Sequence, residues 1–278
     1  MTMIDFATII QSYPVSLQHH KEHIFKEYLQ YHILEAVFSS SVAQKLCFIG
    51  GTALRLWYQN LRFSEDLDFD NKNLSFEEFD DLMYYVQNAL QLKWFKVEMN
   101  TVRKWAYHCS IKFPKLLYEA GISPMLNTKI LIQIDTHDQW YEYEYTRMKF
   151  DAFDTLSLVN IASPSMLLAQ KLFTVFERKR MKGRDFFDIL FLVKITTQPD
   201  WWFLNQTLNI TTPDQLRAYL VDQCQWVDFE ALQQDVSPFL FQTDNQSVKL
   251  FPEFIKQIEW KVQIPRRNHE TLPKVLSN

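Results

Sequence analysis

The chain has 278 residues, of which 47% are hydrophobic and 22% are charged, a composition typical of a globular protein with one large domain or two modest ones. Its formal net charge of −4 excludes a protein-wide positive field for nucleic acid, although a local basic patch is compatible with it.

The cellular location follows from three features of the sequence. The three cysteines, Cys47, Cys109 and Cys224, have no CxxC spacing, which argues against a disulfide scaffold and favours a reducing compartment. The N-terminal segment lacks the basic region of a signal peptide. No apolar run reaches the roughly 18 residues of a membrane span. We therefore expect a cytoplasmic protein with no membrane partner.

The first half of the chain predicts a mixed α/β fold. Apolar residues at helical spacing predict helices at 16–40, with Ser16 as a cap, at 52–60 and at 75–92. Short apolar or alternating runs predict strands at 45–50, 66–70, 95–102, 107–113 and 129–135, with a further strand-like segment at 141–148. From about residue 160 the pattern becomes helical, so we divide the chain into 1–160 and 161–278.

A glycine pair joins the strand at 45–50 to the helix at 52–60. Gly50 and Gly51 would let a triphosphate approach bare backbone, because glycine has no side chain. The free N–H groups at the start of the helix would face that anion, and Thr52 could add a hydroxyl donor. The alternative interpretation is an ordinary turn between a strand and a helix.

Three aspartates on two predicted strands suggest a metal site. Asp66 and Asp68 lie on one face of their strand, because strand side chains alternate. Two carboxylates so close repel each other, and a divalent cation such as Mg²⁺ would turn that repulsion into binding. Asp135 ends the strand at 129–135 on its polar face and can join them. A solvated strand end would explain the same residues without a metal.

The segment 171–190 places a second set of charged residues together. Lys171, Thr174 and Arg178 form one stripe of a predicted helix, and Asp185 and Asp188 begin another helix after Gly183. The basic residues of this region are Lys171, Arg178, Lys179, Arg180, Lys182 and Arg184, against the single acid Glu177. The alternative is a solvated helix end, where lysine and arginine are favoured.

Together, GGTALRLWY, RFSEDLDFD, K-x-x-T-x-x-x-R and KGRDFFDIL resemble the nucleotidyltransferase AbiEii/AbiGii toxin family of the DNA polymerase β-like superfamily. The resemblance implies an α/β (α+β) fold, with a polymerase β-like core and mixed sheet followed by a helical half that completes the active-site cleft. It also implies Mg²⁺-dependent transfer of a nucleotide from an NTP to an acceptor, with tRNA favoured. The chain would then be the toxin of a type IV toxin–antitoxin or abortive-infection system, with a cognate antitoxin as partner.

The resemblance also gives each residue an expected role. Asp66, Asp68 and Asp135 would hold two Mg²⁺ ions. Gly50, Gly51 and Thr52 would bind the β- and γ-phosphates. Lys171, Thr174 and Arg178 would contact the nucleotide and neutralise the leaving pyrophosphate, with Asp185 orienting Lys171 or Arg178. Arg62 would either contact the nucleotide or form an ion pair beside the aspartate strand.

Two other functions stay open at this point. The same core could modify a small molecule or a protein hydroxyl, or the chain could be a catalytically silent binding or partner protein. The basic region at 171–184, with Lys261, Arg266, Arg267 and Lys274, favours RNA. The histidines of HHKEH at 19–23 have no supporting metal ligand, so we interpret them as a solvated helix face. The sequence does not specify which NTP is used.

Overall fold

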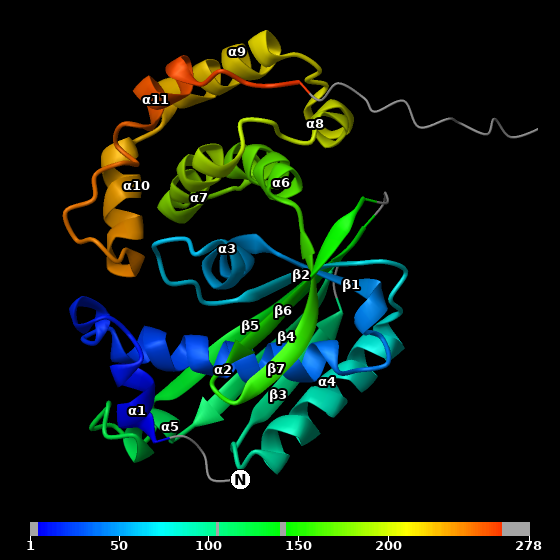
Figure 1. The fold of residues 1–278 in the computed structure, drawn as a ribbon, viewed down its shortest axis with the longest axis vertical. Helices are drawn as coiled ribbons and strands as arrows, with labels where there is room; N and C mark the ends of the chain where they lie inside the picture. The colour runs from blue at the N-terminus through cyan, green and yellow to red at the C-terminus, as the bar shows by residue number, and fades with distance from the viewer. Residues whose placement is uncertain (1–4, 104–105, 140–142, 263–278) are drawn as a thin grey trace, which may run out of the picture.

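A computed structural model describes residues 5–103, 106–139 and 143–262. The basic residues Arg266, Arg267 and Lys274 lie outside the described residues, as does the start of the strand-like segment 141–148. Figure 1 shows a sheet crossed by helices α2 and α4 in the N-terminal half and a stack of helices in the C-terminal half. This arrangement is the mixed α/β fold with a helical second half that the sequence predicts.

The N-terminal helices differ in detail from the prediction. Helix α1 (Phe6–Gln11) packs against α2 (Lys21–Phe38), and a short 3-10 turn (Val15–Leu17) lies between them. Ser16 belongs to that turn and does not cap α2, which begins after His20. The chain must reverse direction here so that α1 can pack on α2, and the predicted start of the helix at residue 16 is therefore wrong.

Within the described residues the sheet is mixed and has seven strands, in the order β3-β4-β5-β2-β1-β7-β6. Its strands are β1 (Leu46–Ile49), β2 (Leu67–Asn71), β3 (Glu98–Arg103), β4 (Tyr107–Pro114), β5 (Lys129–Asp138), β6 (Tyr145–Ala152) and β7 (Thr155–Ala162). The pairs β2–β5 and β1–β7 are parallel, whereas β1–β2, β3–β4, β4–β5 and β6–β7 are antiparallel. The sequence pattern missed β7, although its residues alternate.

The connections of β1 and β2 place the predicted motifs. Helix α3 (Gly50–Tyr58) begins directly at the glycine pair, two residues earlier than predicted. Strand β2 begins at Leu67, so Asp66 directly precedes the strand while Asp68 lies within it. Because β2 pairs with β5 in parallel register, Asp68 lies opposite Asp135.

The two faces of the sheet near β5 differ in their environment. Helices α2 and α4 (Phe76–Leu92) pack on one face, where Ile130, Ile132 and Ile134 are buried. Helix α4 starts with a capping box between Ser75 and Glu78, which explains its sharp N-terminus. On the opposite face, Gln133 and Asp135 are partly exposed. This second face is where polar chemistry can take place.

The second half consists of packed helices. After α5 (Leu116–Glu119) in the first half, these are α6 (Pro164–Glu177), α7 (Gly183–Ile195), α8 (Trp201–Leu208), α9 (Pro213–Gln223), α10 (Phe229–Val236) and α11 (Phe251–Gln257). The sequence pattern missed α8, which begins at Trp201. Two buried apolar clusters divide the molecule, one ending at Ile161 and the other containing Ala162 and the helices beyond it. Cys47 and Leu54 of the first half pack into this second cluster. No helix within the described residues is long and apolar enough to cross a membrane.

Candidate active site

A polar pocket lies where β2, β5 and the start of α3 meet helices α6 and α7. Both halves of the chain contribute side chains to it. Its lining comprises Gly51, Arg62, Ser64, Glu65, Asp66, Asp68, Gln133, Asp135, Lys171, Arg178, Lys182, Arg184 and Asp185. Most of the residues selected from the sequence therefore come together, whereas Gly50, Thr52 and Thr174 are outside this lining.

The three predicted acids share the pocket and influence one another. Burial raises the pKa of Asp68 to about 6, and the charges of Asp135 and Asp66 add to this while Lys171 opposes it. Burial also raises the pKa of Asp66, although Asp66 accepts a hydrogen bond from the Gln133 backbone N–H at 3.3 Å. The carboxylates are thus held together at a cost that a bound cation would offset.

The three carboxylates of the pocket can be compared with the ligands that Mg²⁺ requires. Carboxylate oxygens are suitable ligands for Mg²⁺, and the mutual repulsion of Asp66, Asp68 and Asp135 favours a cation among them. Across the described part of the chain, however, no three His, Cys, Asp or Glu side chains are arranged as a metal-binding group. The acids therefore fit the ion by charge and donor type, and their side chains do not form a ligand set as they stand.

The glycine pair is required for packing as well as for an open backbone. Gly50 has φ +77°, and a Cβ there would lie 2.2 Å from the Asp68 carboxylate. Gly51 does not have a positive φ, but its Cβ would lie 2.3 Å from the Arg62 guanidinium and 2.9 Å from the Ser64 hydroxyl. A side chain at either position would displace the residues that form the floor of the pocket.

Two of the residues expected to contact the nucleotide, Thr52 and Thr174, use their hydroxyls in hydrogen bonds to the backbone. The buried Thr52 hydroxyl donates to the Asp66 carbonyl at 2.5 Å, which fixes the start of α3 beside the aspartate strand. The Thr174 hydroxyl donates to the Gln170 carbonyl one turn back along α6. Both hydroxyls donate to backbone carbonyls in this structure, and their expected contacts with the nucleotide stay a prediction.

A buried ion network connects α7 to the pocket. The Lys171 ammonium lies 2.7 Å from Asp185 and 2.8 Å from Asp188. Arg62 donates two hydrogen bonds to the Asp188 carboxylate of α7, both at 2.7 Å, and it also lines the pocket. Arg178 lies 3.4 Å from Asp185, which thus contacts both basic side chains that it was expected to orient.

In this network the attraction between opposite charges outweighs the effect of burial on the pKa values of Asp188 and Lys171. Burial alone would raise the pKa of Asp188, but Arg62 and Lys171 lower it to about 2. The same pairing holds the pKa of Lys171 above its ordinary value despite burial, because Asp185 and Asp188 are close. Lys171 is therefore charged at the edge of the pocket and is held by two carboxylates.

The rim of the pocket carries further charges that the motifs did not reveal. Arg184 forms an ion pair with Glu65 at 2.7 Å, and Lys26 of α2 approaches the same carboxylate at 3.3 Å. Arg178 is more open, with 41% of its side chain exposed. A pocket with acids on the sheet side and basic groups on the helical side is suited to a metal–triphosphate complex.

His108 is a residue that the sequence analysis missed. It lies opposite Asp135 on β4, and its Nδ1 is 2.7 Å from the Asp135 carboxylate. The alternating strand at 107–113 was predicted, but only the pairing of β4 with β5 shows which of its residues meets Asp135. That pairing is a long-range contact with no local signal in the sequence.

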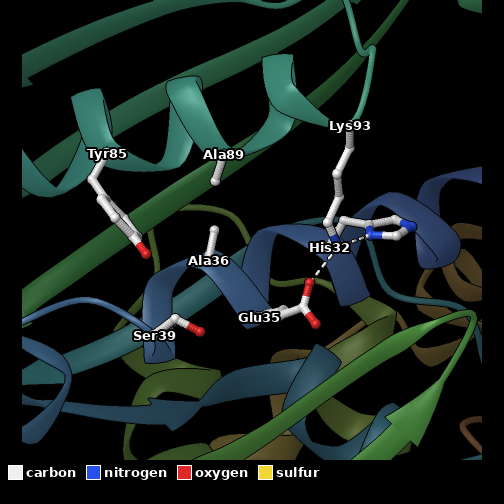
Figure 2. Close-up of a pocket in the computed structure, with 7 residues that line it drawn as sticks. All are labelled: His32, Glu35, Ala36, Ser39, Tyr85, Ala89 and Lys93. Atoms are coloured by element: carbon white, nitrogen blue, oxygen red, sulfur yellow. Dashed lines mark hydrogen bonds and ion pairs between the residues drawn. The ribbon is translucent and has the colours of Figure 1, made fainter. Parts of the chain in front are cut away.

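A separate pocket between α2 and α4 is shown in Figure 2. Lys93 donates to the Glu35 carboxylate and lies 3.0 Å from Nδ1 of His32. The other oxygen of Glu35 accepts a hydrogen bond from the Leu156 backbone N–H, so this group ties α2, α4 and β7 together. None of the predicted site residues lines it.

A family comparison decides the identity of this arrangement. The model of the family described as nucleotidyl transferase AbiEii toxin, type IV toxin–antitoxin system, matches residues 32–264. The chain belongs to this family. As an AbiEii-family protein it is a nucleotidyl transferase and the toxin of a type IV system, and the matched range includes both halves of the pocket.

Solved structures support the same fold. JHP933 from Helicobacter pylori is 17% identical, with a TM-score of 0.51 and coverage of 84% of this chain and 93% of that one. A candidate nucleotidyltransferase from H. pylori is 18% identical, with a TM-score of 0.51 and coverage of 85% and 97%. These likenesses show the fold alone. A comparison with curated proteins gives no match.

Proposed function

We propose that this AbiEii-family protein transfers a nucleotide from an NTP to a hydroxyl of RNA, with tRNA as the acceptor, and depends on Mg²⁺. One pocket brings three carboxylates of the sheet together with Lys171, Arg178, Lys182 and Arg184 of the helical half, and this is the observation that carries the proposal. These basic residues suit both a triphosphate and the phosphates of an RNA end.

The reaction forms one bond and breaks one. The acceptor hydroxyl oxygen bonds to the α-phosphorus, the bond from that phosphorus to the bridging oxygen breaks, pyrophosphate leaves, and the hydroxyl proton passes to solvent. Mg²⁺ held by Asp66, Asp68 and Asp135 would supply a lowered pKa for the attacking hydroxyl and charge compensation for the phosphates.

The protein's own groups then have defined tasks. The backbone at Gly50 and Gly51, at the N-terminus of α3, binds phosphate oxygens. Lys171 and Arg178 neutralise the charge that develops on pyrophosphate, and Asp185 orients both of them. Arg62 acts through Asp188 by fixing the floor of the pocket and does not contact the nucleotide directly.

The direct test is transfer of radiolabel from each of the four NTPs to total tRNA. We expect label from the α-phosphate to be transferred in the presence of Mg²⁺, and label from the γ-phosphate to leave with pyrophosphate. Asp66→Asn and Asp68→Asn should abolish transfer with an unchanged or slightly raised melting temperature, because each change removes repulsion. Asp151→Asn is the matched control, since its side chain is 73% exposed on β6.

The other functions are outcomes of the same assay. Label on protein or on a small molecule in a lysate would replace RNA as the acceptor class. No transfer to any acceptor, or full activity of Asp68→Asn, would contradict the proposal and favour a catalytically silent binding protein.

A further inference from the structure

A second groove continues from the active-site pocket along the sheet. It is lined by Val102, His108, Cys109, Ser110, Gln133 and Asp135. Gln133 and Asp135 also line the active-site pocket, so the two cavities meet at these residues. The groove therefore extends on the side of Asp135 away from the basic residues of α6 and α7.

Strand register explains how the groove forms. His108 lies opposite Asp135 and Ser110 opposite Gln133, while Val102 lies opposite His108 on the next strand. Directly opposed residues share one face of a sheet, so all five side chains lie on the face opposite α2 and α4. Small and polar side chains leave this face hollow and partly exposed.

The charges of the two cavities are different. The active-site pocket contains the basic residues suited to a triphosphate, whereas no lysine or arginine among the described residues lines the groove. Hydrogen-bonding groups of Ser110, Gln133 and His108 beside the apolar Val102 suit an uncharged sugar and base. A nucleoside placed there would have its hydroxyl beside Asp135, at the junction with the triphosphate pocket.

We propose that this groove binds the terminal nucleoside of the RNA acceptor, and that His108 is a positioning residue that orients Asp135 toward it. The inference rests on the proposed nucleotidyl transfer. The 2.7 Å contact between His108 and Asp135 fixes one carboxylate oxygen, and only 29% and 25% of the two side chains are exposed. Asp135 is thereby held at the boundary that both substrates must reach.

To test the groove, a larger side chain is placed in it at a position that is not one of the three acids. Ser110→Leu, with Ser110→Val as a milder variant, should raise the KM for total tRNA about tenfold or more. The affinity for a non-hydrolysable NTP should stay unchanged, because Ser110 does not line the active-site pocket. Lys112→Leu is the matched control: it lies on the same strand and face, is exposed, and lies outside the groove.

The test for His108 compares two substitutions. His108→Ala should lower kcat about tenfold with an unchanged NTP affinity and melting temperature. His108→Asn should restore part of kcat, because its amide N–H can donate to Asp135 as the imidazole does. A merely structural role predicts loss of melting temperature with no rescue by asparagine.

The outcomes separate this inference from the proposed function. An unchanged KM for tRNA in Ser110→Leu, or an NTP affinity that falls with it, would overturn the groove as the acceptor site while nucleotidyl transfer stands. Labelling of protein in place of tRNA by the wild-type chain would overturn a nucleoside as its occupant. Absence of transfer by the wild-type chain would contradict the proposed function, and the inference with it.

Discussion

Gly51 shows how a single residue can serve both packing and binding. The sequence suggested that a side chain at this position would take the space of phosphate oxygens, with an ordinary turn as the alternative. In the structure, the first atoms that a Cβ would meet belong to Arg62 and Ser64. Arg62 is nearly fully buried and held by Asp188, so it cannot move away easily.

We therefore predict that Gly51→Ala lowers the stability of the fold and also weakens the binding of NTP. Overpacking of this kind costs about 1–3 kcal/mol, so the melting temperature should fall clearly. Below the transition, titration with a non-hydrolysable NTP should also show weaker binding, because Arg62 and Ser64 shift into the pocket. An unchanged melting temperature would show that the floor of the pocket is softer than its contacts indicate.

Lys171 and Lys179 differ sharply although they are close in sequence. Lys171 lines the pocket and pairs with two buried acids, whereas Lys179 is exposed and outside the lining. Lys171→Ala should weaken NTP binding by about tenfold or more and lower the melting temperature, because Asp185 and Asp188 lose a partner. Lys179→Ala should change neither. Equal effects on NTP affinity would mean that the basic region acts only as a general positive field.

At the scale of helices and strands, the spacing of apolar residues predicted the elements that depend on neighbouring residues in the sequence. The strand, glycine pair, helix and aspartate strand from 45 to 71 follow from alternation and apolar spacing, and the acids of α7 follow from helical spacing. The order of the sheet, the meeting of His108 with Asp135 and the pairing of Arg62 with Asp188 are contacts between distant segments. The hydrogen bond from the Thr52 hydroxyl to the Asp66 carbonyl could not be predicted either, because the sequence does not show which backbone carbonyl lies nearby.

The pairing of Asp188 with Arg62 and Lys171 ties α7 to α6 and to the segment between α3 and β2, and it predicts a large stability effect. Asp188→Asn would leave two buried basic groups with one carboxylate fewer, at a cost of about 3–5 kcal/mol. Chemical denaturation should show this as a lower midpoint. Glu230→Gln is the control, because its pair with Lys249 is exposed and should contribute less than about 1 kcal/mol. A similar small effect for both variants would contradict the claim that the buried pairs of Asp188 stabilise the fold strongly.

The contact between α2 and α4 predicts a pH effect on stability. Burial and the nearby Lys93 lower the pKa of His32 to about 3, from an ordinary value near 6.5. Below pH 6.5 the unfolded chain gains a proton that the folded chain does not, so stability should fall as the pH drops from 6.5 toward 3. His32→Gln cannot be protonated, and its melting temperature should fall less over this range. Identical slopes would show that His32 does not contribute.

At the scale of the whole molecule, the active site exists only where the two halves meet. The acids Asp66, Asp68 and Asp135 come from the sheet half of the chain, and Lys171, Arg178 and Asp185 come from the helical half. The second apolar cluster also contains Cys47 and Leu54 of the first half, so the two halves are packed together beside the pocket that they share. The family match from 32 to 264 includes both.

The most direct test of this account is a crystal structure of the protein with Mg²⁺ and a non-hydrolysable NTP. We predict metal ions among Asp66, Asp68 and Asp135, and the triphosphate between the backbone of Gly50 and Gly51 and the basic side chains of Lys171 and Arg178. The groove beside His108 should stay open for the acceptor. A nucleotide bound elsewhere, or bound in this pocket without metal at the three aspartates, would contradict the account.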